Sequence, residues 1–292
     1  ADLLPKDIDL ITNSRENTYV LFAVEGTDTI YGYRYFNTGD KRVQSAWFKW
    51  KLDDTIRYFA ILDDVLYIVH TKGNLVQIPL VDKWANWINS FPIHLDNWTE
   101  LTADAFTYNK DTNKTTFSLS GYGFDPDRSV YVINVNAGND IGRYGLATVT
   151  GSEATLSGDW ASIGQSLHVG YNFDMEIKFP TIYPMSQDRK YSDVNGSLVV
   201  HRLQLALGAA GVYETTIERT GKDTYEELIE SSLQDDYLSN KSPWVEQKIH
   251  TLPTYEKNEN LTVYLKSTHP SPTTLYSMSW EGDYTNKFYQ RA

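Results

Sequence analysis

The side chains best suited to acid–base chemistry form four pairs of adjacent carboxylates. The pairs are Asp53-Asp54, Asp63-Asp64, Glu226-Glu227 and Asp235-Asp236. A glycosidase needs two carboxyl groups facing each other across a cleft, about 5 to 10 Å apart. Neighbouring residues of a strand point to opposite faces of the sheet, so adjacent carboxylates do not meet this requirement. We interpret them as parts of hairpin turns and solvated faces.

The six histidines show no spacing that is typical of a metal site. They are His70, His94, His168, His201, His250 and His269, without an H-x-H or H-E-x-x-H motif among them. Oxygen-rich segments at residues 125–127 and 134–140 lack the twelve-residue calcium loop. Clusters of Asp, Asn and Gly mostly form turns. We therefore predict that the chain has no metal site.

Motifs for phosphate binding and for nucleophilic catalysis are also missing. The chain contains no Gly-Lys phosphate loop and no G-x-S-x-G elbow. Gly121-Tyr122-Gly123 lacks the lysine and the helix that such a loop requires. The prediction is a protein that is not an enzyme, with no catalytic residue and no cofactor.

Composition limits the class of protein. With 292 residues and 41% hydrophobic residues, the chain can form two domains or one large domain with an insertion. A mean hydropathy of -0.45 without a long apolar run excludes a membrane-spanning helix. The absence of cysteine excludes disulfides and fits folding in a reducing cytosol. The polar start at Ala1 has neither a signal peptide nor an initiator Met, so we expect a piece of a longer protein.

Charge and aromatic content bear on possible partners. The formal net charge is -12, and no cluster of Lys and Arg stands out, which argues against tight DNA binding but not against DNA passing nearby. The 21 tyrosines and 8 tryptophans fit a β-rich core with subunit contacts, or alternatively platforms for stacking sugars. Trp84, Trp87, Trp98 and Trp160 are the candidates for such platforms.

Short alternating segments separated by turn residues predict an all-β fold. In the first part of the chain, the expected strands are residues 19–24, 30–36, 43–52, 56–62, 65–70 and 75–80, with hairpins at Asp63-Asp64 and Gly73-Asn74. Later strands are expected at 115–119, 130–135, 147–150, 171–179, 202–205, 211–217 and 261–267. This spacing favours antiparallel propeller-like blades with appended β-sandwich or barrel domains. The predicted domains are residues 1–96, 97–170 and 171–292.

Two segments allow more than one interpretation. Residues 84–92 fit a short helix or an aromatic loop. Residues 225–233 carry apolar side chains at helix spacing, with Asp223 as a possible N-cap, but we favour strand and loop there.

A collinear series of motifs resembles a known family. The series runs from Q-S-A-W-F-K-W (residues 44–50) through V-G-Y-N-F-D-M-E (169–176) and H-R-L-Q-L (201–205) to W-E-G-D-Y (280–284). In this order the motifs resemble tail tubular protein B, the tail nozzle family of short-tailed bacteriophages. The residues that carry the resemblance are Trp47, Trp50, Tyr171, Arg202, Leu203, Leu205, Trp280, Glu281, Gly282 and Tyr284.

The resemblance implies a structural virion protein of the phage tail, made in the host cytoplasm. Family members form a six-fold ring that channels genomic DNA during ejection, below an adaptor ring of tail tubular protein A and near the tail fibres. We expect Trp280 to be buried, Gly282 to turn the chain, and Glu281 and Asp283 to be solvated turn residues. The alternative hypothesis is a β-protein that binds or degrades host surface polysaccharides.

Overall fold

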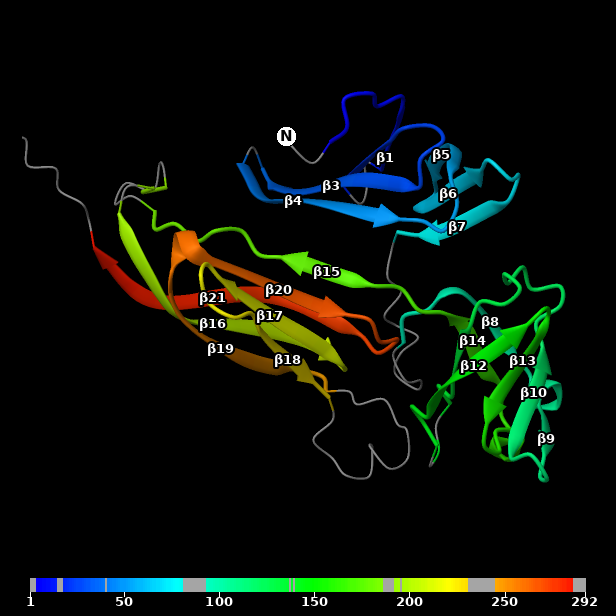
Figure 1. Cartoon of the computed structure of the whole chain (residues 1–292). Helices are drawn as coiled ribbons and strands as arrows, with labels where there is room; N and C mark the ends of the chain where they lie inside the picture. The colour runs from blue at the N-terminus through cyan, green and yellow to red at the C-terminus, as the bar shows by residue number, and fades with distance from the viewer. Residues whose placement is uncertain are drawn as a thin grey trace, which may run out of the picture. The chain divides into compact units, whose positions relative to one another are not determined.

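The structure is a computed structural model in which we describe residues 4–14, 18–39, 41–80, 93–136, 138, 140–185, 192–194, 196–230 and 245–285. These residues form β-strands and short 3-10 turns (Figure 1), and every strand pairing is antiparallel. No described helix is long and apolar enough to cross a membrane. The predicted all-β class is confirmed.

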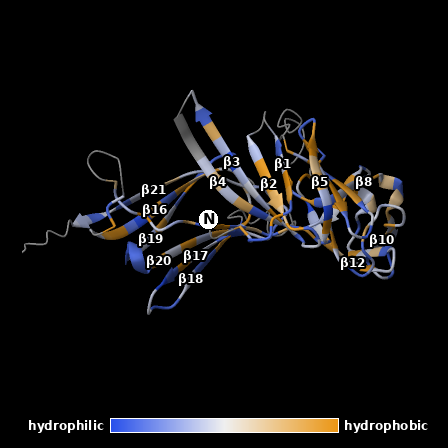
Figure 2. Ribbon diagram, turned by 90° about the horizontal axis from the view of Figure 1, so that it is seen from above, coloured by the Kyte–Doolittle hydropathy of each residue, from blue (hydrophilic) through white to orange (hydrophobic). Residues whose placement is uncertain are grey.

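The chain separates into two compact units, residues 1–86 and 87–292. Each unit is built around its own buried side chains, and three hydrophobic cores occur in total among the described residues. Figure 2 shows how hydrophobic and hydrophilic residues mix along the strands. The domain boundaries at 96/97 and 170/171 stay predictions.

The first unit contains a four-stranded and a three-stranded sheet. The strands of the first sheet, paired in chain order, are β1 Leu10–Ser14, β2 Tyr19–Ala23, β3 Thr29–Thr38 and β4 Lys41–Lys51. Those of the second are β5 Ile56–Leu62, β6 Val65–His70 and β7 Leu75–Pro79. Both predicted hairpins are present, since Leu62 pairs with Val65 and the His70 N–H donates to the Asn74 carbonyl at 2.9 Å.

One hydrophobic core joins the two sheets of the first unit. Leu21 and Ile30 from the first sheet meet Phe59 and Ile68 from the second. A side chain at Gly32 would displace the Phe48 ring, because a Cβ atom there would lie 2.0 Å from it. The opposite face of the first sheet carries the aromatic side chains of Phe22, Tyr33 and Trp47.

The second unit begins with a seven-stranded sheet. Its strands are β8 Asp96–Leu101, β9 Thr107–Asn109, β10 Lys114–Ser118, β11 Val130–Ile133, β12 Tyr144–Thr150, β13 Glu153–Ser157 and β14 Leu167–Tyr171. They are ordered β8-β14-β11-β12-β13-β10-β9. Leu101 near one end of the sheet and Phe117 near the other belong to one core, so the sheet curls on itself into a half-barrel.

The rest of the second unit is a β-sandwich. One sheet is ordered β15-β20-β17-β18 and the other β19-β16-β21. The strands are β15 Met175–Lys178, β16 Ser197–Ala210, β17 Tyr213–Arg219, β18 Tyr225–Ile229, β19 Lys248–Lys257, β20 Leu261–Ser267 and β21 Thr273–Thr285. Leu203 and Leu205 of one sheet pack with Ile217 and Leu265 of the other.

Some strand predictions need correction. The expected strand at 171–179 is two strands, because the ladder breaks between Tyr171 and Met175. Strands β1, β8, β9, β13, β14 and β19 were not expected from the sequence as separate elements. The strand preferred for residues 225–229 is confirmed as β18, and residues 84–92 lie outside the described part of the chain.

Candidate functional site

Two of the family-like motifs lie side by side in the sandwich. H-R-L-Q-L belongs to β16 and W-E-G-D-Y to β21, and these strands are neighbours (Figure 1). Arg202 pairs with Glu281, and Leu203 pairs with Trp280. Motifs that are far apart in the sequence therefore form one continuous ladder.

In the sheet β19-β16-β21, strand pairing is irregular at the same place on both sides of β16, between Val200 and Arg202. Relative to β21, strand β16 has one extra residue, His201, because Val200 pairs with Gly282 while Arg202 pairs with Glu281. Strand β19 also has one extra residue relative to β16. Arg202 pairs with Pro253 and Val200 pairs with Glu256, so two residues of β19 face the single residue His201. We call this region, residues 200–202, 253–256 and 281–283, the bulge site.

The bulge resets the alternation of β16. Val200 and Leu203 both face the core although they are three residues apart, which regular alternation would not permit. The two residues between them both contact carboxylates of β21. Arg202 Nε lies 2.9 Å from Glu281 Oε2, and His201 Nε2 lies 3.3 Å from Asp283 Oδ2.

On β19 the bulge site contains a strained tyrosine. Tyr255 has φ 45°, in the left-handed region, and its side chain is 67% exposed. Its ring stacks on His201 with centroids 5.5 Å apart. Beside it, the buried Thr254 hydroxyl donates to the Val200 carbonyl at 2.8 Å, which satisfies a carbonyl at the irregular step.

Gly282 is part of a strand, not of a turn as predicted. It lies within β21, and a Cβ atom at this position would stand 2.2 Å from the Val199 carbonyl oxygen. Glycine is needed because two backbones approach closely. Glu281 and Asp283 are likewise strand residues, and Trp280 is 36% exposed where burial was expected.

Tyr284 fastens the end of this ladder. Its hydroxyl hydrogen-bonds the Asp193 carboxylate, which also accepts from the Gly196 N–H at 3.2 Å. The hydrogen bond to Asp193 raises the pKa of Tyr284. The Tyr284 ring fills the space that a side chain at Gly196 would occupy.

The other residues of the resemblance lie elsewhere. In the first unit, Trp50 packs against the core beside Phe48. Trp47 lies on the opposite face of its sheet, with its ring 4.6 Å from that of Tyr33 and 6.0 Å from that of Phe22.

Tyr171 is buried in the half-barrel of the second unit. Its hydroxyl oxygen accepts from the Asp125 N–H at 2.6 Å, and the Arg128 guanidinium lies 3.8 Å above its ring. These contacts fix the loop before β11 and indicate a structural role.

The carboxylate pairs of the described residues lie in separate turns and strands. Asp63 and Asp64 occupy the β5–β6 turn, both with positive φ. Glu226 is exposed on β18, whereas Glu227 is half-buried. Asp235 and Asp236 lie outside the described residues. Within the described ranges, no group of three acidic or histidine side chains is placed to hold a metal ion.

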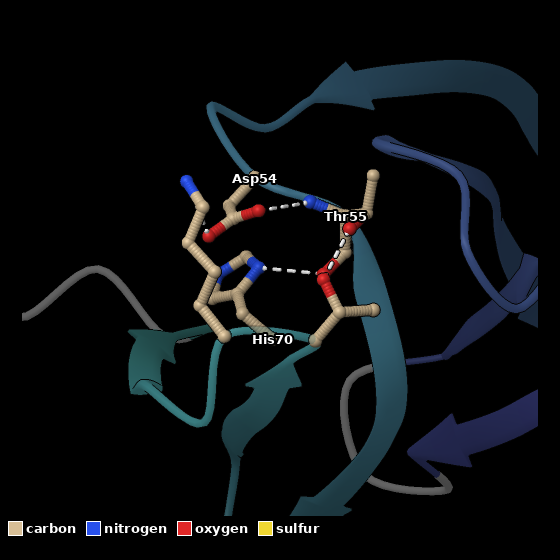
Figure 3. A network of polar contacts seen from close by, with 5 residues as sticks. Asp54, Thr55 and His70 are labelled. Atoms are coloured by element: carbon tan, nitrogen blue, oxygen red, sulfur yellow. Dashed lines mark hydrogen bonds and ion pairs between the residues drawn. The ribbon is translucent and has the colours of Figure 1, made fainter.

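Asp54 belongs to a polar network of the first unit (Figure 3). Its carboxylate accepts from the Thr55 N–H at 2.8 Å and lies 3.2 Å from Lys72 Nζ. The bond from Thr55, supported by Lys72, lowers the pKa of Asp54. His70 Nδ1 lies 3.2 Å from the Thr55 carbonyl oxygen, so the network ties the β6–β7 hairpin to the start of β5.

A buried polar cluster in the sandwich was not expected from the sequence. His250 Nδ1 lies 3.1 Å from the Tyr213 hydroxyl, and His250 Nε2 lies 3.5 Å from a Glu227 carboxylate oxygen. Burial lowers the pKa of His250 against the opposing effect of Glu227, and burial raises the pKa of Tyr213. In the structure β19 buries alternate residues, His250, Leu252 and Thr254, which places His250 in the core.

The cavity that lies near the bulge site is too small for a substrate. It lies between Val200, Asn258 and Val263 and measures about 10 Å³, enough for one water molecule. Among the tryptophans proposed for sugar stacking, Trp160 is buried, Trp98 is exposed and stacks on His168, and Trp84 and Trp87 lie outside the described residues.

Comparison with known families decides the classification. The family model described as bacteriophage nozzle protein matches residues 1–291. The chain belongs to the bacteriophage nozzle protein family. No individually curated protein matches it significantly. Membership makes the chain a structural component of a phage tail, as the resemblance implied.

In this nozzle protein, most residues of the family-like motifs take part in strand pairing or in a hydrophobic core. Arg202, Leu203, Trp280, Glu281, Gly282 and Tyr284 form one ladder around the bulge site, and Leu205 continues it into the core. That these particular residues define the family stays a prediction.

Proposed function

We propose that the chain is a non-enzymatic subunit of a six-fold nozzle ring through which double-stranded DNA leaves the virion of a short-tailed phage. Its neighbours in the tail are an adaptor ring of the tail tubular protein A type and the tail fibres. The match to the nozzle family over residues 1–291 carries this proposal. The two sheets of the first unit serve as propeller-like blades, because β1 to β4 form an up-and-down meander.

The net charge supports passage of DNA without retention. Duplex DNA carries about one negative charge per 1.7 Å, so a cationic channel would bind it and slow its exit. The chain has a net charge of -12. We propose that acidic side chains line the channel.

The outer face of sheet β15-β20-β17-β18 is our candidate for the channel wall. Glu214, Glu218 and Glu226 occupy this face on β17 and β18, and Glu218 accepts from the Tyr264 hydroxyl at 3.4 Å. Lys266 Nζ lies 3.9 Å from Glu176 Oε2, so this carboxylate neutralises part of the positive charge on the face.

Density for an intact tail tests the proposal directly. We expect six copies of the chain around a channel whose wall is mainly Asp and Glu. A chain located outside the nozzle would contradict the function, and a channel wall of mainly Lys and Arg would contradict only its acidic lining.

An exposed aromatic face favours glycan binding as a second candidate function. Phe22, Tyr33 and Trp47 lie next to one another on the first sheet, and Trp47 is 45% exposed. Incubation of the chain with host lipopolysaccharide tests this candidate. Retention that is lost in Trp47→Ala but kept in Trp98→Ala would support it, and absence of retention would reject it.

A further inference from the structure

The five sheets of the described chain have ten edge strands, and most of them are poorly suited to pairing with another strand. Natural proteins protect edges by keeping them short, or by placing Pro, Lys or a bulge in them. The following edges are only three to seven residues long: β1, β5, β7, β8, β9, β15 and β18. Strand β19 is longer but contains Pro253 and the strained Tyr255.

Two long edges remain. Strand β21 has 13 residues and contains neither Pro nor Lys, and it pairs only with β16 in the described structure. Strand β4 also lacks Pro; it has 11 residues and pairs only with β3. Its lysines Lys49 and Lys51 disfavour pairing with an edge that does not carry matching negative charge. Each therefore offers an extended row of backbone N–H and C=O groups along its outer edge.

The charges on these edges are complementary. Glu281 and Asp283 are two residues apart on β21, so they share a face, and both stay exposed although Arg202 and His201 of β16 contact one oxygen of each. Lys49 and Lys51 are also two residues apart and exposed on β4. In the described part of the chain, neither lysine has an ion-pair partner.

We propose that β21 of one chain pairs antiparallel with β4 of a second copy of the same chain. Lys51 then stands opposite Glu281, and Lys49 stands opposite Asp283. Gly282 stands opposite Trp50, which faces the core of its own unit. Because Gly282 pairs with the core-facing Val200, the buried faces of the two joined sheets lie on the same side.

The contact is heterologous, because two different edges of the molecule meet. Contacts of this kind close into rings when the rotation between copies permits it. This pairing rests on the proposed ring, in which β21 and β4 would connect neighbouring subunits.

Disulfide trapping tests the pairing, since the chain has no cysteine of its own. Full-length Lys49→Cys and Asp283→Cys proteins are mixed and oxidised, and cross-linked dimers are counted on a non-reducing gel. Directly opposed residues of antiparallel strands lie about 4.5 to 5.5 Å apart at Cα, within disulfide reach. We expect a dimer yield at least about tenfold above that of a control mixture of Lys49→Cys and Glu176→Cys.

A charge exchange provides the second measurement. In the same trapping assay, Lys51→Glu should lower the yield severalfold, and adding Glu281→Lys to the partner should restore it. A trapping yield no higher than that of the control overturns the inference. A double Lys49→Cys, Asp283→Cys protein that cross-links only within single chains overturns it as well. The ring itself is judged separately from tail density, so either idea can fail without the other.

Discussion

At the scale of single residues, Gly282 shows how close backbone packing restricts sequence. A methyl group at this position would stand 2.2 Å from the Val199 carbonyl oxygen, and backbone cannot move aside as easily as a side chain. We expect Gly282→Ala to lower the free energy of unfolding by about 1–3 kcal/mol, measured by urea denaturation. Ser277→Ala, at an exposed position of the same strand, is the control. Equal stability of the two variants would contradict the close approach.

Tyr255 allows backbone strain to be measured separately from side-chain contacts. In an ordinary strand Ala is more stable than Gly, but at φ 45° the order should reverse. We expect Tyr255→Gly to be more stable than Tyr255→Ala by about 1 kcal/mol. At Thr251, an exposed residue of the same strand, Ala should be the more stable replacement. The same order at both positions would show that Tyr255 is unstrained.

His269 should make stability depend on pH. Burial lowers its pKa to about 4, and its Nε2 has no hydrogen-bond partner among the described residues. The unfolded chain binds a proton near pH 6.5, while the folded chain does so only near pH 4. The contribution of His269 is therefore complete above about pH 7 and is lost as the pH falls, by up to about 3 kcal/mol.

The variant His269→Gln tests this effect by chemical denaturation at pH 7.5 and pH 5. We expect a smaller loss of stability between the two pH values than in the unmodified chain. Other buried histidines, such as His250, act equally in both proteins and cancel in the comparison. An unchanged loss would mean that His269 does not control this pH dependence.

At the scale of secondary-structure elements, local patterns were informative where strands alternate regularly. The expected strand at residues 65–70 matches β6, because turn residues bound a clear period of two. The expected strand at 56–62 matches β5 as well, although a register shift between Ile56 and Tyr58 interrupts its alternation. The bulge site was not predictable, since the extra residue His201 gives β16 two alternating patterns that are out of phase. A bulge follows from pairing with two other strands, and a single sequence does not contain that pairing.

Thr254 stabilises this bulge through one buried hydrogen bond. Its hydroxyl donates to the Val200 carbonyl, and Thr254→Val keeps the shape while removing the donor. We expect a loss of about 1–3 kcal/mol in the free energy of unfolding, because the buried carbonyl loses this donor. Thr251→Val, exposed on the same strand, should change stability by less than about 0.5 kcal/mol. A loss equal to that of the control would show that the carbonyl finds another donor.

At the scale of the whole molecule, the sequence indicated the class and the family through the order of its motifs, but not how the motifs meet. Trp47 and Trp280 both belong to that series, yet they lie in separate units with separate cores. The H-R-L-Q-L and W-E-G-D-Y motifs are partners because of sheet order, which depends on long-range pairing. Asp54, from one of the carboxylate pairs, forms an ion pair with Lys72, and Glu281, which was expected in a turn, forms an ion pair with Arg202 of the neighbouring strand.

The acidic balance of the whole molecule predicts weak contact with DNA. Non-specific binding depends on cations that displace counterions from phosphates, and typical dissociation constants are about 10⁻⁴ to 10⁻⁶ M. With a net charge of -12, we expect the chain at ~10 μM to leave duplex DNA unshifted in a gel, even at ~50 mM salt. The triple variant Glu214→Lys, Glu218→Lys, Glu226→Lys places three more cations on the face that holds Lys178 and Lys266. It should shift the same DNA at ~50 mM salt and release it at ~200 mM. Binding by the unmodified chain would show that local cations outweigh its net charge and would remove the electrostatic argument for unhindered passage.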